Sequence, residues 1–179
     1  MTSIIKVNTF QDTGGNALFS SDGSGNVTTS ASGLQNTPYF HVKITTETSM
    51  SQNTWTKVGY DTIVTDSDSV FSTANNRFTV PTGKGGKYFL TWSWRIASLG
   101  DGQRIDTAIY KNGSFLNYTL YQDIHAWTSV RTVHQSVIMD LSATDYIEVW
   151  GRQNSGSTQN TNSVNDTGTF FQGYKLIGA

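Results

Sequence analysis

The sequence has no cysteine, few charges and no long apolar run, and each absence excludes a class of protein. Without cysteine there are no disulfides, thiolate metal sites or cysteine nucleophiles, and the redox compartment stays undecided. Charged residues make up 14% of the 179 residues, and the net charge is −1. The chain therefore lacks the excess of positive charge that binding to nucleic-acid phosphates requires. No apolar run approaches the roughly 20 residues of a membrane span, and the first eight residues lack the apolar region of a signal peptide. The sequence therefore predicts neither membrane insertion nor export.

Good helix formers are also scarce. Only two glutamates are present, Glu47 and Glu148, whereas Ser, Thr and Asn together supply 59 residues. Thr, Val, Ile and aromatic residues favour strands, and an aromatic content of 12% is too high for a disordered chain. We therefore expect an all-β protein with one domain at residues 36–179 and a short β-rich extension at residues 1–35.

The N-terminal extension carries the same turn sequence twice. Asp12–Asn16 and Asp22–Asn26 both read D-x-x-G-N, and each is followed by a short β-prone piece, which predicts a small meander. These turns lack the ligand pattern of known calcium loops, so no metal is expected. The extension has too few apolar residues to bury a core of its own. It must therefore stay flexible, lie on the main domain or, as we expect, associate with other chains through its apolar residues, namely Ile4, Ile5, Val7 and Phe10.

Strands follow one another at short intervals in the main domain. The strongest alternation runs from Tyr88 to Ile96, where every second residue is large and apolar, so this side is expected to form core. Asn112-Gly113 between two β-rich runs predicts a tight hairpin. The polar tract at residues 153–168 reads as a loop. About eight to ten strands in this length predict a two-sheet sandwich.

The order of these signals resembles the complement C1q-like globular head, a relative of the tumour necrosis factor fold. The matching pieces appear in family order, at Val58–Asp61, Asn76–Pro81, Gly86–Leu90, Lys111–Gly113, Leu141–Val149 and Thr169–Leu176. Two departures stand out: Thr144 replaces a common glycine, and there is no collagen stalk. The N-terminal extension instead resembles the short β-rich leaders of phage virion proteins, such as tail fibres, head fibres and capsid decoration proteins.

The resemblance implies a jelly roll of about ten strands that forms a homotrimer. Large rings at successive strand positions agree with this, because rings on an outer face need a partner. The expected trimer interface comprises Phe89, Phe170, Phe171 and Tyr174. The alternative is a monomer with a few exposed aromatic residues.

No pattern in the sequence indicates catalysis. His41, His125 and His134 do not have zinc-ligand spacing, and no G-x-S-x-G elbow is present. Glu148 is expected to face outward or to pair with a basic neighbour. Asp101, Arg104 and Asp106 read as a solvated loop with local ion pairs. We therefore expect a protein that is not an enzyme and needs no cofactor.

A polar and aromatic loop at the far end of the sandwich is the expected receptor contact. Its residues suit sugar rings and their hydroxyls, although the same rings could simply seal the core. The preferred hypothesis is a trimeric fibre or spike on the virion surface that is made in the host cytoplasm, contacts other virion proteins through its extension and binds a host glycan or protein. The alternatives are a capsid decoration or cement protein and a monomeric carbohydrate-binding module. The candidate contact residues are Tyr118, Tyr121, Asp123, His125 and Trp127.

Overall fold

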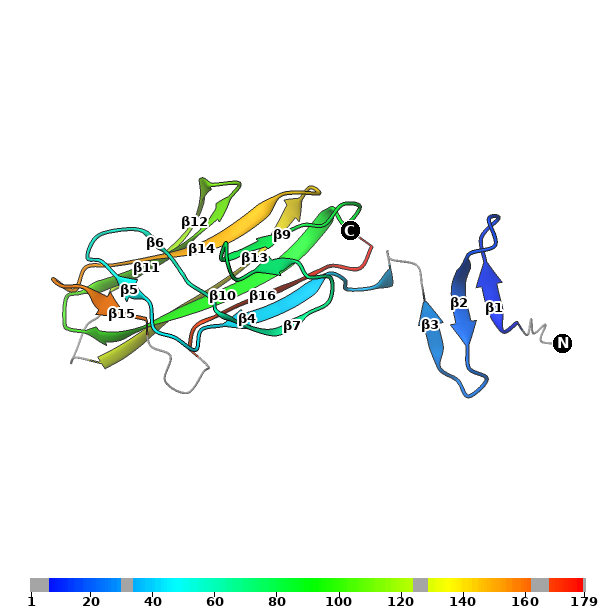
Figure 1. Cartoon of the computed structure of the whole chain (residues 1–179), viewed down its shortest axis with the longest axis horizontal. Helices are drawn as coiled ribbons and strands as arrows, with labels where there is room; N and C mark the ends of the chain where they lie inside the picture. The colour runs from blue at the N-terminus through cyan, green and yellow to red at the C-terminus, as the bar shows by residue number, and fades with distance from the viewer. Residues whose placement is uncertain (1–6, 30–33, 124–128, 162–167, 179) are drawn as a thin grey trace.

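The computed structural model describes residues 7–29, 34–123, 129–161 and 168–178, and its elements are strands joined by turns (Figure 1). A three-stranded antiparallel sheet comes first, and Figure 1 shows it beyond one end of a larger two-sheet sandwich. We call it the N-terminal sheet. It consists of β1 (Thr9–Gln11), β2 (Ala17–Ser21) and β3 (Val27–Thr29).

The turns of the N-terminal sheet confirm the predicted meander. The Asp12 carboxylate accepts hydrogen bonds from the backbone amides of Gly14 (2.8 Å) and Asn16 (2.9 Å). Asp22 accepts the equivalent bonds from Ser24 and Asn26 at the second turn. The side-chain amides of Asn16 and Asn26 also donate to Asp12 (2.9 Å) and Asp22 (2.6 Å), and these side-chain bonds, together with the backbone bonds, lower the pKa of both aspartates. The repeated sequence therefore builds the same turn twice.

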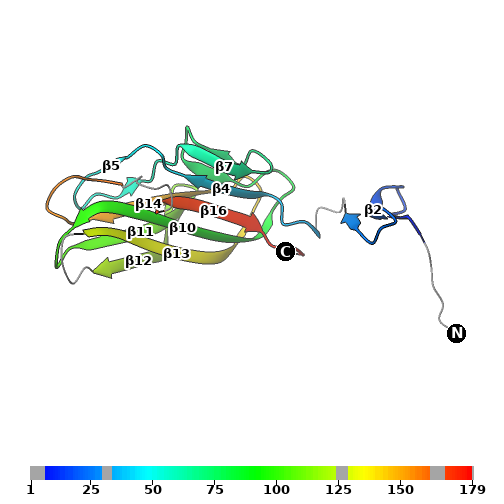
Figure 2. The ribbon, with the colours of Figure 1, turned by 90° about the horizontal axis from the view of Figure 1, so that it is seen from below.

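The first layer of the sandwich is a five-stranded sheet, which we call the β10 sheet. Its strands lie side by side in Figure 2, in the order β13-β10-β16-β4-β7. The bounds are β13 (Ser129–Leu141), β10 (Gly86–Leu99), β16 (Phe170–Lys175), β4 (Tyr39–Lys43) and β7 (Thr62–Asp66).

The second layer, which we call the β14 sheet, has the order β12-β11-β14-β9-β8, with β6 also paired to β14. A separate two-stranded sheet joins β5 (Ser49–Met50) and β15 (Gln159–Asn160). Part of the tract expected as a loop at residues 153–168 is therefore strand, and residues 162–167 lie outside the described residues. The bounds in the β14 sheet are β12 (Ser114–Asp123), β11 (Arg104–Lys111), β14 (Tyr146–Gln153), β9 (Arg77–Thr79), β8 (Phe71–Ser72) and β6 (Thr56–Lys57).

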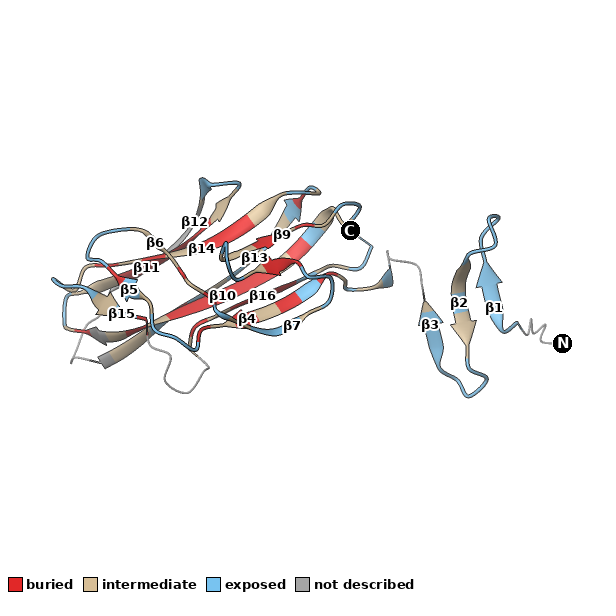
Figure 3. Cartoon of the chain, viewed as in Figure 1, coloured by how far each residue is buried: buried red, intermediate tan, exposed pale blue. Residues whose placement is uncertain are grey.

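The core lies between the two sheets, where Figure 3 shows buried residues along β10 and β14. The alternation predicted for β10 is confirmed, because the five large apolar residues are fully buried. The indole N–H of Trp92 donates to Thr107 Oγ1 (2.8 Å), and that of Trp94 donates to the Asp106 carbonyl (3.0 Å). Both polar groups are thus satisfied on the opposite sheet, as burial requires. The five residues are Tyr88, Leu90, Trp92, Trp94 and Ile96.

The β11–β12 hairpin turns at Asn112 and Gly113, as the sequence predicts. Their φ angles are +53° and +77°, the left-handed pair that a two-residue hairpin of this twist requires. The Asn112 side chain accepts a hydrogen bond from the Tyr146 amide (2.9 Å) and donates one to Asp145 (2.7 Å). The turn is therefore tied to the start of β14.

Candidate functional site

The outer face of the β10 sheet carries a row of large apolar side chains. Phe89 in β10 lies opposite Ile138 in β13 and Tyr174 in β16, and Tyr174 lies opposite Tyr39 in β4. Ile138, Tyr39 and Tyr174 are 57%, 42% and 38% exposed, and Phe89 is half-buried. The Phe89 and Tyr174 rings contact one another, with centroids 5.5 Å apart. We call these four residues the apolar row.

The positions beside the apolar row are polar. A hollow of about 350 Å³ lies against the row and is lined in part by His41, Thr91 and Gln172. His134 forms a 2.7 Å hydrogen bond with the Thr91 hydroxyl, and Phe170 lies between His41 and His134, with ring centroids about 6 Å from each. Burial, and secondarily the nearby Lys43 charge, lowers the pKa of His41. The neutral imidazole is therefore favoured on this face at neutral pH.

Only three of the four residues predicted for the trimer interface lie on the outer face of the β10 sheet. Phe89, Phe170 and Tyr174 lie on the outer face, but Phe171 is fully buried against Phe40, with ring centroids 4.8 Å apart. The prediction for Phe171 was wrong because consecutive strand residues point to opposite faces of a sheet. Sequence reasoning also missed Tyr39 and Ile138. The alternation of the strands does indicate that both side chains point outward. Tyr39, for example, precedes the core residue Phe40 in β4.

The predicted receptor loop is partly strand. Tyr118, Tyr121 and Asp123 lie in β12, where Tyr121 is paired with Asp106 and Asp123 with Arg104 of β11. His125 and Trp127 lie outside the described residues. A receptor contact at these positions stays a prediction.

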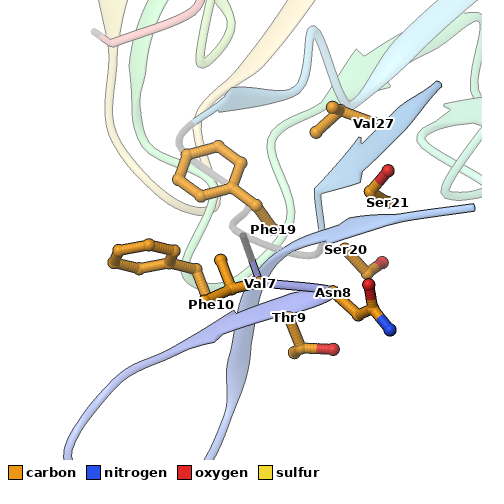
Figure 4. A pocket seen from close by; sticks show the side chains of 8 residues that line it. All are labelled: Val7, Asn8, Thr9, Phe10, Phe19, Ser20, Ser21 and Val27. Atoms are coloured by element: carbon orange, nitrogen blue, oxygen red, sulfur yellow. The ribbon is translucent and has the colours of Figure 1, made fainter. Parts of the chain in front are cut away.

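The N-terminal sheet presents a second apolar patch, shown in Figure 4. Phe10 and Phe19 are paired across β1 and β2 and are 56% and 42% exposed. Val7 and Val27, 51% and 66% exposed, line the same hollow of about 130 Å³. Two of the predicted anchoring residues, Val7 and Phe10, therefore lie on one patch, whereas Ile4 and Ile5 lie outside the described residues. We call Val7, Phe10, Phe19 and Val27 the N-terminal patch.

Two carboxylates of the β14 sheet, those of Glu148 and Asp106, are held in ion pairs. Glu148 accepts a hydrogen bond from Lys57 Nζ at 2.8 Å, which confirms the expected basic neighbour. The expected local ion pair is confirmed between Arg104 and Asp106 (2.9 Å), and Asp101 lies exposed in a turn. Asp106 itself is buried in β11 and also pairs with Arg152 (2.7 Å), so the expectation of a solvated loop was wrong for Arg104 and Asp106. The sequence did not show this pairing because Arg152 is distant in sequence. The β11–β14 register brings it opposite Asp106.

Across 7–29, 34–123, 129–161 and 168–178, no three His, Cys, Asp or Glu side chains gather as metal ligands would. Within the same ranges, no helix has the length and apolar character needed to cross a bilayer.

Comparison with solved structures identifies the architecture. No family model matches the sequence, and no curated protein matches it. Murine APRIL is similar at 17% identity and a TM-score of 0.59, over 78% of this chain and 98% of that chain. The globular domain of zebrafish complement 1qA is similar at 15% identity and 0.54, over 78% and 97%. The Eiger tumour necrosis factor of S. frugiperda gives 13% and 0.55, over 79% and 92%.

The fold is that of the C1q and tumour necrosis factor heads. The C1q/TNF-like architecture predicted from the sequence is thereby confirmed, and identities of 13–17% establish the fold alone. The departure at Thr144 has a structural counterpart, because Thr144 adopts a φ of +73°. Glycine adopts this left-handed conformation without strain. The glycine that is common at this position would therefore suit the backbone conformation that Thr144 adopts here.

Proposed function

We propose that the chain is a non-enzymatic, homotrimeric structural protein displayed on a phage-like particle, as a fibre or spike that attaches to a host surface receptor. The observation that carries this proposal is the apolar row on the open face of a C1q/TNF-like head. Heads of this fold often form trimers. Three copies that meet at this face would remove Ile138, Tyr39 and Tyr174 from water. Burying such contiguous apolar surface favours association.

The N-terminal patch supplies the attachment to the particle in this proposal. Residues 7–29 carry two charges, Asp12 and Asp22, and both carboxylates are engaged in turns. Phe10 and Phe19 therefore offer an apolar contact for another virion protein without a charge to desolvate. Figure 1 shows the N-terminal sheet beyond the end of the sandwich at which β4 begins and β16 ends, so the remaining surface of the head can face outward.

The N-terminal patch also supports a second candidate function, that of a capsid decoration or cement protein. An uncharged apolar patch on a separate small sheet can insert between neighbouring capsid subunits as readily as into a tail or fibre base. The head would then stabilise the lattice instead of binding a receptor. The two candidates differ in where the protein lies on the particle.

Antibody labelling of intact particles tests the proposed function. Antibodies raised against the purified chain are expected to label intact particles from the same source in electron micrographs, and pre-immune serum should not. Label on projecting appendages supports a fibre or spike, whereas label spread regularly over the capsid supports decoration. Label that appears only after particles are disrupted would place the chain inside the particle and contradict display.

A further inference from the structure

A histidine lies directly beside the apolar row. His41 belongs to β4, where it is opposite Gln172 of β16 and Thr65 of β7, and all three residues line the hollow of about 350 Å³. Its imidazole is half-buried in the single chain and lies 6.1 Å from the Phe170 ring, measured between centroids. Tyr39, two residues earlier on the same face of β4, is part of the apolar row. His41 therefore borders the proposed subunit contact.

The charge that acts on His41 from its own strand is positive. Lys43 lies two residues further along β4, on the same face. Burial lowers the pKa of His41 most, and the Lys43 charge lowers it further. Across the strand pairing, β7 presents the uncharged Thr65. Both the burial and the neighbouring cation therefore oppose a charged imidazole at this position.

The carboxylates at the two ends of β7 are held by backbone amides. Asp66, the last residue of β7, accepts hydrogen bonds from the amides of residues 70 and 71, both at 2.9 Å. Asp61, which precedes β7, accepts hydrogen bonds from the amides of residues 45 and 46, at 2.8 and 2.7 Å. Each carboxylate is thus already engaged within its own turn or loop.

The other strands of this face place neutral groups next to His41. β16 presents Gln172, and beyond it β10 presents Thr91, whose hydroxyl is bonded to His134 of β13 at 2.7 Å. On the far side of the apolar row, Lys87 and Asp140 are paired with each other at 3.0 Å. Among the described residues, the charged or titratable side chains on the outer face of β16, β10 and β13 are Tyr174, Lys87, Arg95, His134 and Asp140.

We propose that His41 makes the subunit contact dependent on pH: three copies associate at neutral pH, while His41 is uncharged, and separate in mild acid, when it takes up a proton. This inference rests on the proposed function, because it concerns the trimer contact named there. Contact at the apolar row removes water from the adjoining hollow, and a charged imidazole there would lose its hydration. Three protonated copies of His41 would also add three positive charges to the assembly, next to Lys43 in each copy.

The direction of the pH effect follows from which state takes up the proton. At neutral pH the imidazole is uncharged in the separate chain and in the trimer, so it adds no cost to association. As the pH falls through the pKa of the separate chain, that state takes up a proton that the trimer excludes, and the trimer is weakened. For each pH unit below that pKa, one such histidine lowers the association constant about tenfold, and a trimer contains three.

The mass of the full-length chain at pH 7.5 and at pH 5.0 tests the inference. Light scattering over a dilution series gives the concentration at which half of the chains are trimeric. We expect this concentration to be at least tenfold higher at pH 5.0, with circular dichroism showing a folded head at both pH values. Equal concentrations at the two pH values, a tighter trimer at pH 5.0, or dissociation only where the head unfolds would overturn the inference.

Two substitutions of His41 place the effect at this residue. His41→Gln keeps a neutral polar side chain and is expected to stay trimeric at pH 5.0, with less than a threefold change from pH 7.5. His41→Arg is charged at every pH and is expected to be a single chain already at pH 7.5. If folded His41→Gln keeps the tenfold response, or folded His41→Arg stays trimeric at pH 7.5, His41 is not the sensor.

His134→Gln is the matched control. His134 lies on the same face but is exposed in the single chain and bonded to Thr91. This variant is expected to keep the tenfold response to pH. A response that disappears in His134→Gln and persists in His41→Gln would contradict the assignment to His41.

The outcome is separable from that of the proposed function. A trimer of the same stability at both pH values would leave the proposed trimer in place and overturn only its dependence on pH. A single chain at both pH values and at every concentration would contradict the trimer itself, and the proposed function and this inference would fail together.

Discussion

A chain carrying Tyr174→Asp is expected to exist in solution as a single subunit instead of three. Tyr174 lies in the middle of the apolar row, between Phe89 and Tyr39. In the proposed trimer the substitution would bury an unpaired carboxylate in each of three subunits, and the desolvation of each charge costs several kcal/mol. Tyr174 is 38% exposed in the isolated head, so the head itself should tolerate the change. Light scattering measures the mass, and circular dichroism checks the fold.

Phe115→Asp is the matched control for this prediction. Phe115 has a similar exposure of 45% but lies on β12 in the opposite sheet. The control variant should keep the mass of three chains. If Tyr174→Asp also keeps that mass, the apolar row is not the contact between subunits.

Among alanine substitutions of the aromatic residues in β16, Phe171→Ala is expected to lower the free energy of unfolding most. Phe171 is fully buried and packs against Phe40 and Tyr60, with ring centroids at 4.8 Å and 6.0 Å. Truncation of a buried phenylalanine removes its burial energy and leaves a cavity, which costs about 3–5 kcal/mol of unfolding free energy. Urea unfolding followed by tryptophan fluorescence measures this loss.

Phe170→Ala tests the same assignment from the neighbouring position. Phe170 is half-buried on the outer face beside His41 and His134, so its truncation leaves no cavity in the core. Its loss of unfolding free energy should be less than half of that for Phe171→Ala. Equal losses, or a larger loss for Phe170→Ala, would contradict the register of β16.

The sequence predicts the fold well where local pattern and tertiary structure agree. The alternation through β10 identifies five core residues because two stacked sheets bury one face of each strand. The Asn112-Gly113 turn is identified because few residue pairs accept two successive left-handed conformations. The repeated Asp turns of the N-terminal sheet are found for a similar reason, since each aspartate satisfies the backbone of its own turn.

The candidate sites could be predicted only in part, because they depend on how distant strands pair. The apolar row joins residues from β4, β10, β13 and β16, and no local pattern shows that Tyr39 and Ile138 lie in the same row as Phe89. Ring contacts on the other sheet likewise connect Trp55 with Trp150, which is distant in sequence, through Phe115 and Tyr110. Two adjacent phenylalanines suggested one interface, but the pleat of β16 sends Phe171 into the core.

The mass of the unmodified, full-length chain in solution tests the central claim most directly. Native mass spectrometry or light scattering should give about 59 kDa, three times the 19.7 kDa of one chain. That result would support a trimeric C1q/TNF-like head with the apolar row at its subunit contacts. A single species of 19.7 kDa at working concentrations would contradict the trimer, and with it the proposed role of the apolar row.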